Sequence, residues 1–290
     1  MATWDSDCAP QYQLTDGKHT EMSSTKVYVV VNQKGGVGKT TIAANLAAVT
    51  AEVHPPDVPP EVAAALKELD PEDPDSEAEL ELLMEKVTAH VLAVSTDPQQ
   101  SLVEWLEKVE RAYWKQKKPL PLDYSQEDEN PRVLASLKTA DVYRRIFVDS
   151  PGWLPSEHAR QKDEPTEKLI VRASLESADL AILPLEPEDL AFNPTKRTIE
   201  EVVEPLKIPF VVVLTNWDPR DGDGDLADTR DRAKAEGWPL ANTVVRRYKL
   251  HTSAPAAGRL CTDYPKNRVA VEARSDFLKL GMELALNGGN

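Results

Sequence analysis

The sequence of 290 residues is poor in cysteine: Cys8 and Cys261 stand far apart, and no C-x-x-C pair occurs. This scarcity excludes a disulfide framework and a zinc or iron–sulfur site built on cysteine. No apolar run approaches the roughly 18 residues that a membrane-spanning helix needs. The first ten residues also lack the basic start and the apolar core of a signal peptide. We therefore expect a soluble, cytoplasmic protein without a membrane partner.

Basic residues are in the minority, because 34 Lys and Arg stand against 49 Asp and Glu and give a formal net charge of -15. An acidic surface repels a phosphate backbone, so the average charge argues against a nucleic-acid partner. The charge is unevenly distributed, however. Residues 51–90 hold twelve acids and two lysines, whereas residues 241–274 hold seven basic residues and two acids. The second segment is therefore locally basic.

Five short runs rich in valine and isoleucine predict strands that are buried on both faces of a parallel sheet. These runs cover residues 27–31, 91–94, 146–148, 180–183 and 210–214. Helical patterns separate them, at residues 40–50, 99–113, 166–177 and 195–205. The alternation predicts an α/β fold with a mostly parallel sheet flanked by helices, in a single domain over residues 26–290. Residues 1–25 are polar and without periodicity, which predicts a flexible N-terminal arm.

Two segments interrupt this alternation. Residues 51–89 are acidic and carry four prolines near their start, followed by a helical stretch that Ser76 opens with Glu79 three residues on, a capping box. We interpret them as an acidic helical insertion, either a solvated decoration or a docking or autoinhibitory element. Residues 115–132 are rich in proline and acidic residues, and we interpret them as a connection.

The stretch NQKGGVGKTT, residues 32–41, nearly fits the phosphate-loop rule G-x-x-x-x-G-K-[ST]. It follows a predicted strand and precedes a predicted helix, so its backbone N–H groups and the helix dipole favour a bound phosphate. Glycines permit close approach, the lysine reaches the β- and γ-phosphates, and the threonine hydroxyl can ligate Mg²⁺. The alternative is a glycine turn without a ligand. The residues with these roles are Gly35, Gly36, Gly38, Lys39 and Thr40.

Two aspartates follow predicted strands. Asp149 in RRIFVDSPG stands where a phosphate loop places a second ligand for its metal, and the alternative role is a cap for the next turn. Asp97 in VLAVSTDPQQS ends another buried strand, and the alternative there is an N-cap for the helix that begins near residue 99.

Four motifs together carry a family resemblance: KGGVGKTT, the DPQ after the second strand, VDSPG, and TVVRRYKLHTSAPAAG. They resemble the ParA/MinD group of deviant Walker ATPases, specifically the ParA partition proteins, over most of residues 26–287. The resemblance implies a P-loop NTPase fold, the cofactors ATP and Mg²⁺, and a homodimer in the ATP-bound state. It also accounts for a departure from the loop rule. Gln33 replaces the first glycine, and the additional Lys34 matches the family's lysine that reaches the partner's phosphates. The alternative is a hydrated surface lysine.

The resemblance implies further site residues. Asp97 matches the aspartate that helps to position the attacking water, although Ser95 stands where the family often has another aspartate. Asn216 and Pro255 match positions that contact adenine, and a turn asparagine and a loop proline are the alternatives. Catalytic roles fall to Lys34, Lys39 and Asp97, and metal binding to Thr40 and Asp149. Nucleotide contacts are implied for Lys34, Gly35, Gly36, Val37, Gly38, Lys39, Thr40, Thr41, Asn216 and Pro255.

The locally basic segment predicts a surface that neutralises phosphates without reading bases, which is sequence-independent DNA binding. Solvated or ion-paired side chains are the alternative. ParA proteins bind nucleoid DNA as ATP dimers, and a ParB-type centromere-binding protein stimulates hydrolysis, so the resemblance implies both partners. A MinD-like membrane-associated ATPase is the rival, but the C-terminal helical stretch looks like a core-packing helix. The candidate DNA-binding residues are Arg246, Arg247, Lys249, Arg259, Lys266 and Arg268.

Overall fold

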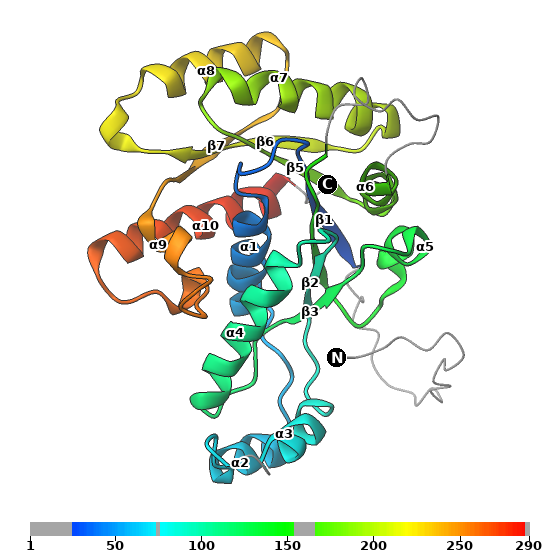
Figure 1. Ribbon diagram of the computed structural model, residues 1–290, viewed down its shortest axis with the longest axis vertical. Coiled ribbons are helices and arrows are strands. Elements are labelled where there is room, and N and C mark those ends of the chain that lie inside the picture. Colours follow the sequence, from blue (N-terminus) through cyan, green and yellow to red (C-terminus); the bar gives the residue numbers. More distant parts are fainter. Residues whose placement is uncertain (1–24, 74–75, 154–165, 288–290) are drawn as a thin grey trace.

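The computed structural model describes residues 25–73, 76–153 and 166–287 (Figure 1), so the predicted N-terminal arm lies outside the described residues except for Thr25. Seven strands form one sheet in the order β3-β2-β4-β1-β5-β6-β7, and all neighbouring strands are parallel. The predicted α/β fold is therefore confirmed. The strands are β1 (Lys26–Val30), β2 (Val91–Ser95), β3 (Asp123–Gln126), β4 (Arg145–Asp149), β5 (Leu180–Leu185), β6 (Phe210–Trp217) and β7 (Leu240–Arg246).

The five predicted strands are the central strands of the sheet, and the two edge strands were missed. Central strands are buried on both faces, which is why they read as continuous apolar runs. Strand β3 has the polar sequence DYSQ and is only partly buried, and β7 has the mixed sequence LANTVVR. Residues 115–132, which the sequence analysis interprets only as a connection, contain β3.

Helices cover both faces of the sheet (Figure 1). One face carries α1 (Lys39–Val53), α4 (Ser101–Lys115) and α10 (Arg268–Asn287). The other face carries α5 (Pro131–Ala135), α6 (Thr166–Glu176), α7 (Asp189–Thr198) and α8 (Gly224–Ala235). The short α9 (Lys249–Ser253) precedes α10. None of the described helices is long and apolar enough to cross a membrane.

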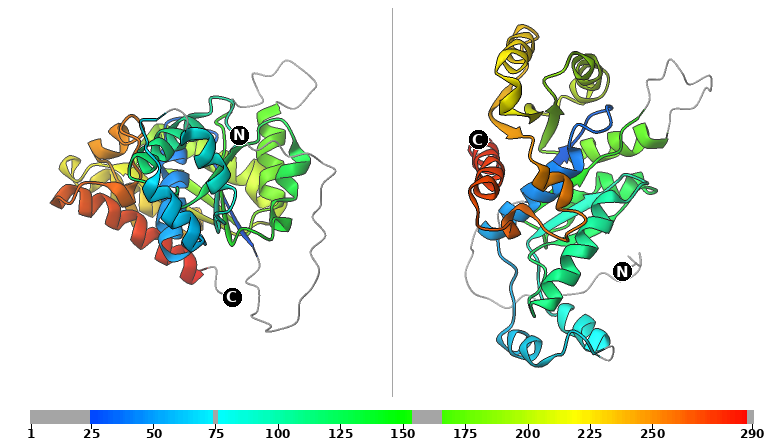
Figure 2. Two further views of the ribbon diagram at one scale, coloured as in Figure 1. Left: turned by 90° about the horizontal axis from the view of Figure 1, so that it is seen from below. Right: turned by 60° about the vertical axis from the view of Figure 1, so that its left-hand side comes forward.

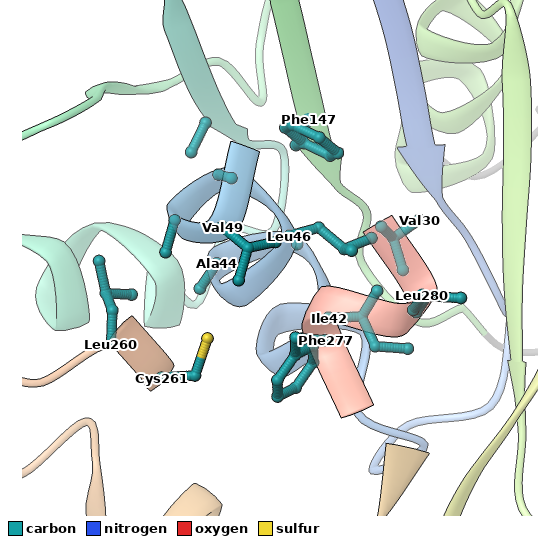
Figure 3. Packing of buried hydrophobic residues seen from close by; sticks show 14 of the residues in the cluster. Val30, Ile42, Ala44, Leu46, Val49, Phe147, Leu260, Cys261, Phe277 and Leu280 are labelled. Carbon is teal, nitrogen blue, oxygen red and sulfur yellow. The ribbon is translucent and has the colours of Figure 1, made fainter. Parts of the chain in front are cut away.

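Helix α1 lies between the sheet and α10, and this packing fixes the position of its first turn. Ile42 and Leu46 are 1% exposed, and Phe277 and Leu280 of α10 are fully buried in the same cluster (Figure 3). Five alanines of α1 are buried and let the helix approach its neighbours closely. Because the helix is held on several sides, the loop that precedes it starts from a fixed point.

Helix α7 begins earlier than the sequence pattern indicates. The pattern predicts a helix over residues 195–205, whereas α7 starts at Asp189 and continues through a π-helical turn at Ile199–Val203. Pro194 lies inside the helix, at its sixth position. A proline near a helix start reads as a helix boundary, so the prediction placed the start at the wrong residue.

The acidic segment contains two helices, α2 (Pro60–Glu68) and α3 (Ser76–Met84), and its first residues continue α1 to Val53. An antiparallel bridge between Asp57 and Thr88 closes its base. Its own small core includes Val62 and Leu66 and packs against Trp114 of α4. The insertion follows the C-terminal end of α1 and projects away from the phosphate loop (Figure 2).

Candidate functional site

The phosphate loop joins β1 to α1 at the carboxyl edge of the sheet. Gly36 and Gly38 have φ of 82° and 88°, a conformation that a side chain would strain. Gly38 is the N-cap of α1, and no side chain in the described part of the protein caps the N–H groups of the first turn. Together with the dipole of a 15-residue helix, these groups form an anion site suited to phosphate. The loop and the first helical turn contain Gly35, Gly36, Val37, Gly38, Lys39, Thr40 and Thr41.

Side chains of the loop tie it to neighbouring elements. Asn32 is fully buried and donates from Nδ2 to the backbone of β5 and to Thr195 Oγ1, both at 2.8 Å. The Gln33 N–H donates to Thr198 Oγ1 at 3.1 Å. With its carboxamide oxygen turned toward Arg197, Gln33 also accepts from the guanidinium at 3.1 and 3.2 Å. A glutamine at the first-glycine position therefore anchors the loop to α7.

Lys39 is the lysine of the loop rule, and it is buried, with 8% of its surface exposed. Its Nζ donates to the carbonyl oxygen of Lys34 at 3.1 Å, so the ammonium lies over the loop. Desolvation lowers the pKa of Lys39, and the negative charges of Asp149 and Asp97 oppose that shift. The structure thus brings the loop lysine and both predicted aspartates into electrostatic contact.

The Lys34 ammonium pairs with carboxylates that lie outside the phosphate loop. Its Nζ lies 3.2 Å from Glu186 Oε2 and 3.9 Å from Glu188 Oε2, in the segment that follows β5. The Lys34 side chain is 24% exposed and the Glu186 side chain 15% exposed, so the closer pair is partly shielded from water. In this protomer Lys34 is therefore a partly exposed lysine that is paired with a carboxylate.

Asp97 lies in the turn between β2 and α4. Its Oδ1 accepts from the Gln99 N–H at 2.9 Å, and its carbonyl accepts from the Gln100 N–H at 2.9 Å. The N-cap of α4 is Gln100, which has φ of 55° and no side-chain cap. The N-cap alternative for Asp97 is therefore wrong: its carboxylate closes the turn before the helix.

The two predicted adenine contacts lie in different surroundings. Asn216, at φ of 57°, donates from Nδ2 to Glu186 Oε1 at 2.6 Å and to the Gly36 carbonyl at 3.3 Å. Its amide is thus directed at the phosphate loop. Pro255 lies in the turn after α9, where its carbonyl accepts from the Gly258 N–H at 3.4 Å. Among the described residues, no hydrogen bond links that turn to Asn216 or to the phosphate loop.

The six basic candidates differ in how they are paired. Arg246 donates from Nη2 to Asp276 Oδ1 at 2.7 Å and from Nε to Asp276 Oδ2 at 2.9 Å, and Asp276 is 3% exposed. Arg268 donates to Glu272 at 2.9 Å. For these two residues the ion-paired alternative is the one observed. The exposed members of the set are Arg247, Lys249, Arg259, Lys266 and Arg268.

Comparison with known proteins identifies the family of this chain. The CobQ/CobB/MinD/ParA nucleotide-binding domain matches residues 28–260. The chain belongs to this ParA/MinD family. The "Maintenance of carboxysome distribution protein A" of Gloeobacter kilaueensis is 30% identical over 262 residues, which cover 90% of this chain and 95% of that protein.

Solved structures show the same fold at low sequence identity. MinD of Pyrococcus horikoshii complexed with Mg-ADP is 18% identical, with a TM-score of 0.57 over 91% of this chain and 98% of that one. The ATP complex of a Cyanothece McdA variant is 15% identical, with a TM-score of 0.55 over 91% and 97% of the two chains. These structures share the P-loop NTPase fold of this chain, which is a member of the ParA/MinD family.

In this member of the ParA/MinD family, the residues around Asp149 suit Mg²⁺. Asp149 is 1% exposed, and its carboxylate lies beside the Thr40 hydroxyl without a hydrogen bond of good geometry to any described residue. Burial raises its pKa to about 7, and the neighbouring Thr40 hydroxyl and Lys39 ammonium oppose the shift. The described residues contain no cluster of three or more His, Cys, Asp or Glu ligands. Magnesium commonly binds one carboxylate plus substrate phosphates, so Thr40 and Asp149 would hold it with a nucleotide, and it would neutralise phosphate charge.

Sequence reasoning missed Glu186 and Gln126. Glu186 contacts both Lys34 and Asn216, and Gln126 donates from Nε2 to the Asp97 carbonyl at 3.0 Å. Both lie at the carboxyl end of a strand, where ligands of open parallel sheets bind. That rule could have found Glu186, because β5 was predicted. The same rule could not have found Gln126, because strand β3 was not predicted from the sequence.

Proposed function

We propose that the protein is an ATP-switched partition ATPase. ATP drives formation of a face-to-face homodimer, the dimer binds DNA without reading its sequence, and a ParB-type partner stimulates hydrolysis and release. The observation that most supports this proposal is the position of the Lys34 side chain. Lys34 is a residue of the phosphate loop, but its ammonium contacts Glu186 and Glu188 rather than that loop.

The position of Lys34 supports action on a second subunit. Lys39 already lies over the loop of its own protomer, so a second cation is not required there. Lys34 is partly exposed at the open carboxyl edge of the sheet. Once released from Glu186, it can extend toward a triphosphate on a facing copy. A cation that meets charge developing on the γ-phosphate stabilises the transition state of phosphoryl transfer.

Asp97 supports the hydrolytic step. It lies near Lys39 and Asp149, and among the described residues its carboxylate has one hydrogen-bond partner, the Gln99 N–H at 2.9 Å. A carboxylate fixed in a tight turn beside the phosphate loop is suited to orient a water molecule. We therefore assign it the positioning of the attacking water.

We assign fewer residues to the DNA-binding surface than the sequence alone indicates. Arg246 is occupied by the buried Asp276, and we assign it a structural role. Arg247, Lys249, Arg259 and Lys266 are exposed, and we assign phosphate contacts to them. The relative named for carboxysome distribution indicates that the transported cargo need not be a replicon. In this proposal DNA is the surface on which the dimer is held, and the partner determines the cargo.

The rival MinD-like function requires an amphipathic helix whose apolar face is free to enter a membrane. In α10 the apolar side chains of Phe277, Leu280 and Leu284 are 3% exposed or less and belong to the core. The described part of α10 is thus a packing helix, which favours DNA over lipid as the binding surface.

Fluorescence anisotropy with duplexes of unrelated sequence tests the proposal, using ADP, ATP or a non-hydrolysable ATP analogue at several salt concentrations. We expect binding only with ATP or the analogue, equal for all sequences and weakened by salt. Lys34→Ala should retain ATP binding but lose dimerisation or turnover. DNA binding that ignores the nucleotide, or sedimentation with anionic liposomes instead of DNA, contradicts the proposal.

A further inference from the structure

Three polar side chains form a row at the carboxyl ends of β3, β2 and β4. Gln126 is the register partner of Ser95, and Ser95 is the register partner of Asp149. Register partners on parallel strands project from the same face of a sheet. Ala93 and Phe147, two residues earlier on β2 and β4, belong to the core cluster beneath α1 and α4. The row therefore faces the side of the sheet on which α1 and the phosphate loop lie.

Oxygen atoms in this row are buried and without hydrogen-bond partners. Among the described residues, seven buried side-chain atoms lack a partner, and four of them are Ser95 Oγ, Gln126 Oε1 and both carboxylate oxygens of Asp149. Ser95 is fully buried and Asp149 is 1% exposed. Buried polar atoms are nearly always satisfied by protein, water or an ion. Their concentration beside the phosphate loop indicates a site for a hydrated cation rather than scattered packing faults.

Gln126 also contacts the Asp97 turn directly. Its Nε2 donates to the Asp97 carbonyl at 3.0 Å, and that carbonyl also accepts from the Gln100 N–H. The Glu127 N–H donates to the Ser95 carbonyl at 2.8 Å, which holds the end of β3 against β2. One carboxamide thus fixes the backbone of Asp97 with its nitrogen and leaves its oxygen in the polar row.

We propose that Gln126 is a positioning residue of the nucleotide site. Its amide nitrogen holds the Asp97 turn, and its Oε1, with the Ser95 hydroxyl, binds the water shell of the Mg²⁺ that Thr40 and Asp149 would hold. The inference rests on the proposed ATPase function. A carboxamide and a hydroxyl suit this place because they accept hydrogen bonds without adding negative charge next to Asp149 and Asp97. Such outer contacts commonly change metal affinity about 10- to 100-fold.

The test compares Gln126→Leu, Gln126→Glu and the control Gln116→Leu. Gln116 is exposed at the end of α4, where its Nε2 donates to the Ala112 carbonyl. Electron paramagnetic resonance titration of Mn²⁺ into the ADP-loaded full-length protein measures metal affinity. Hydrogen exchange of the Gln99 and Gln100 amides reports on the Asp97 turn.

We expect Gln126→Leu to weaken Mn²⁺ binding about 10-fold or more and to speed exchange in the turn, while affinity for metal-free ADP stays within about twofold. Gln126→Glu keeps an acceptor, adds a negative charge and loses the donor, so it should bind Mn²⁺ at least as tightly as wild type and still speed exchange. The control should match wild type in both measurements. If Gln126→Leu and Gln126→Glu both match wild type, the inference is overturned, whether or not DNA binding is observed. If the protein does not bind DNA but the Mn²⁺ affinities are as expected, only the proposed role in partition is overturned.

Discussion

The Lys34 ammonium lies 3.2 Å from one carboxylate oxygen of Glu186, and the other oxygen accepts a hydrogen bond from Asn216 at 2.6 Å. Glu186 therefore joins the phosphate loop, the end of β5 and the end of β6 in one contact. In a single protomer, Glu186 therefore neutralises the positive charge of Lys34, which the proposed dimer needs at the partner's triphosphate. Any approach of Lys34 to a partner's phosphate has to break this contact first.

Replacing Glu186 by glutamine should favour the ATP-bound dimer. The carboxamide oxygen can still accept from Asn216, while the charge that holds Lys34 is removed. A partly exposed ion pair contributes about 1 kcal/mol, and a dimer breaks two of them, so its dissociation constant should fall by about an order of magnitude. Sedimentation equilibrium with a non-hydrolysable ATP analogue measures this change.

Glu188→Gln is the matched control for that experiment. Its carboxylate lies 3.9 Å from Lys34 and is 65% exposed, so its loss should change dimerisation much less. Equal effects of the two variants, or a weaker dimer for Glu186→Gln, would show that the Glu186 contact does not restrain Lys34.

Asp97→Ala should separate nucleotide binding from hydrolysis. The carboxylate accepts one backbone N–H, so its removal should cost only about 1 kcal/mol of stability. Loss of a group that positions water should slow single-turnover hydrolysis about 100-fold or more, and the ATP dimer should remain on DNA. Gln99→Ala, in the same turn but with an exposed side chain, is the control. Normal hydrolysis in Asp97→Ala would remove Asp97 from the mechanism.

The raised pKa of Asp149 leads us to expect opposite pH dependences for two quantities: the stability of the metal-free protein and the strength of magnesium binding. Burial raises its pKa to about 7, against about 3.9 in an unfolded chain. Between these values the folded state binds the extra proton, so the contribution of Asp149 to the stability of the metal-free protein falls as pH rises. Magnesium requires the ionised carboxylate, so its binding should strengthen over the same range.

Asp149→Asn checks this expectation by thermal melting at pH 6 and pH 8. The metal-free variant should melt higher than wild type at pH 8, by a few degrees, since about 1 kcal/mol shifts Tm by about 2 °C at this size. Mg-ADP should raise the Tm of wild type more at pH 8 than at pH 6 and should add little in the variant. A metal-free variant that melts below wild type at pH 8 contradicts the assignment.

Arg246 and Arg247 are neighbours with different expected effects. Arg246→Ala leaves Asp276, which is 3% exposed, without its cation and should destabilise the fold by about 3 kcal/mol. Arg247 is exposed, so Arg247→Ala should change stability by about 0.5 kcal/mol or less. It should instead weaken DNA binding and reduce the salt slope by about 1. Urea unfolding and DNA titration of both variants test this, and an Arg247→Ala protein with unchanged DNA affinity would exclude Arg247 from the surface.

The sequence alone identified the features that depend on residues close together in the chain. The phosphate loop was found because its glycines, lysine and threonine act through local backbone conformation and a helix start. The five central strands were found because burial on both faces makes each of them a continuous apolar run. The edge strands were missed because partial burial leaves no such pattern. The start of α7 was missed because Pro194 reads as a boundary.

Only the tertiary structure decided which residues meet at the carboxyl edge of the sheet. Lys34 and Glu186 are 152 positions apart, and Gln126 contacts Asp97 from another strand, 29 positions away. Such contacts depend on strand order and register, which no local spacing encodes. The sequence determined the loop that is suited to a phosphate, because one strand, one loop and one helix start suffice for that. The fold decided what restrains Lys34 and what supports Asp97, because those partners come from distant strands brought to the same edge.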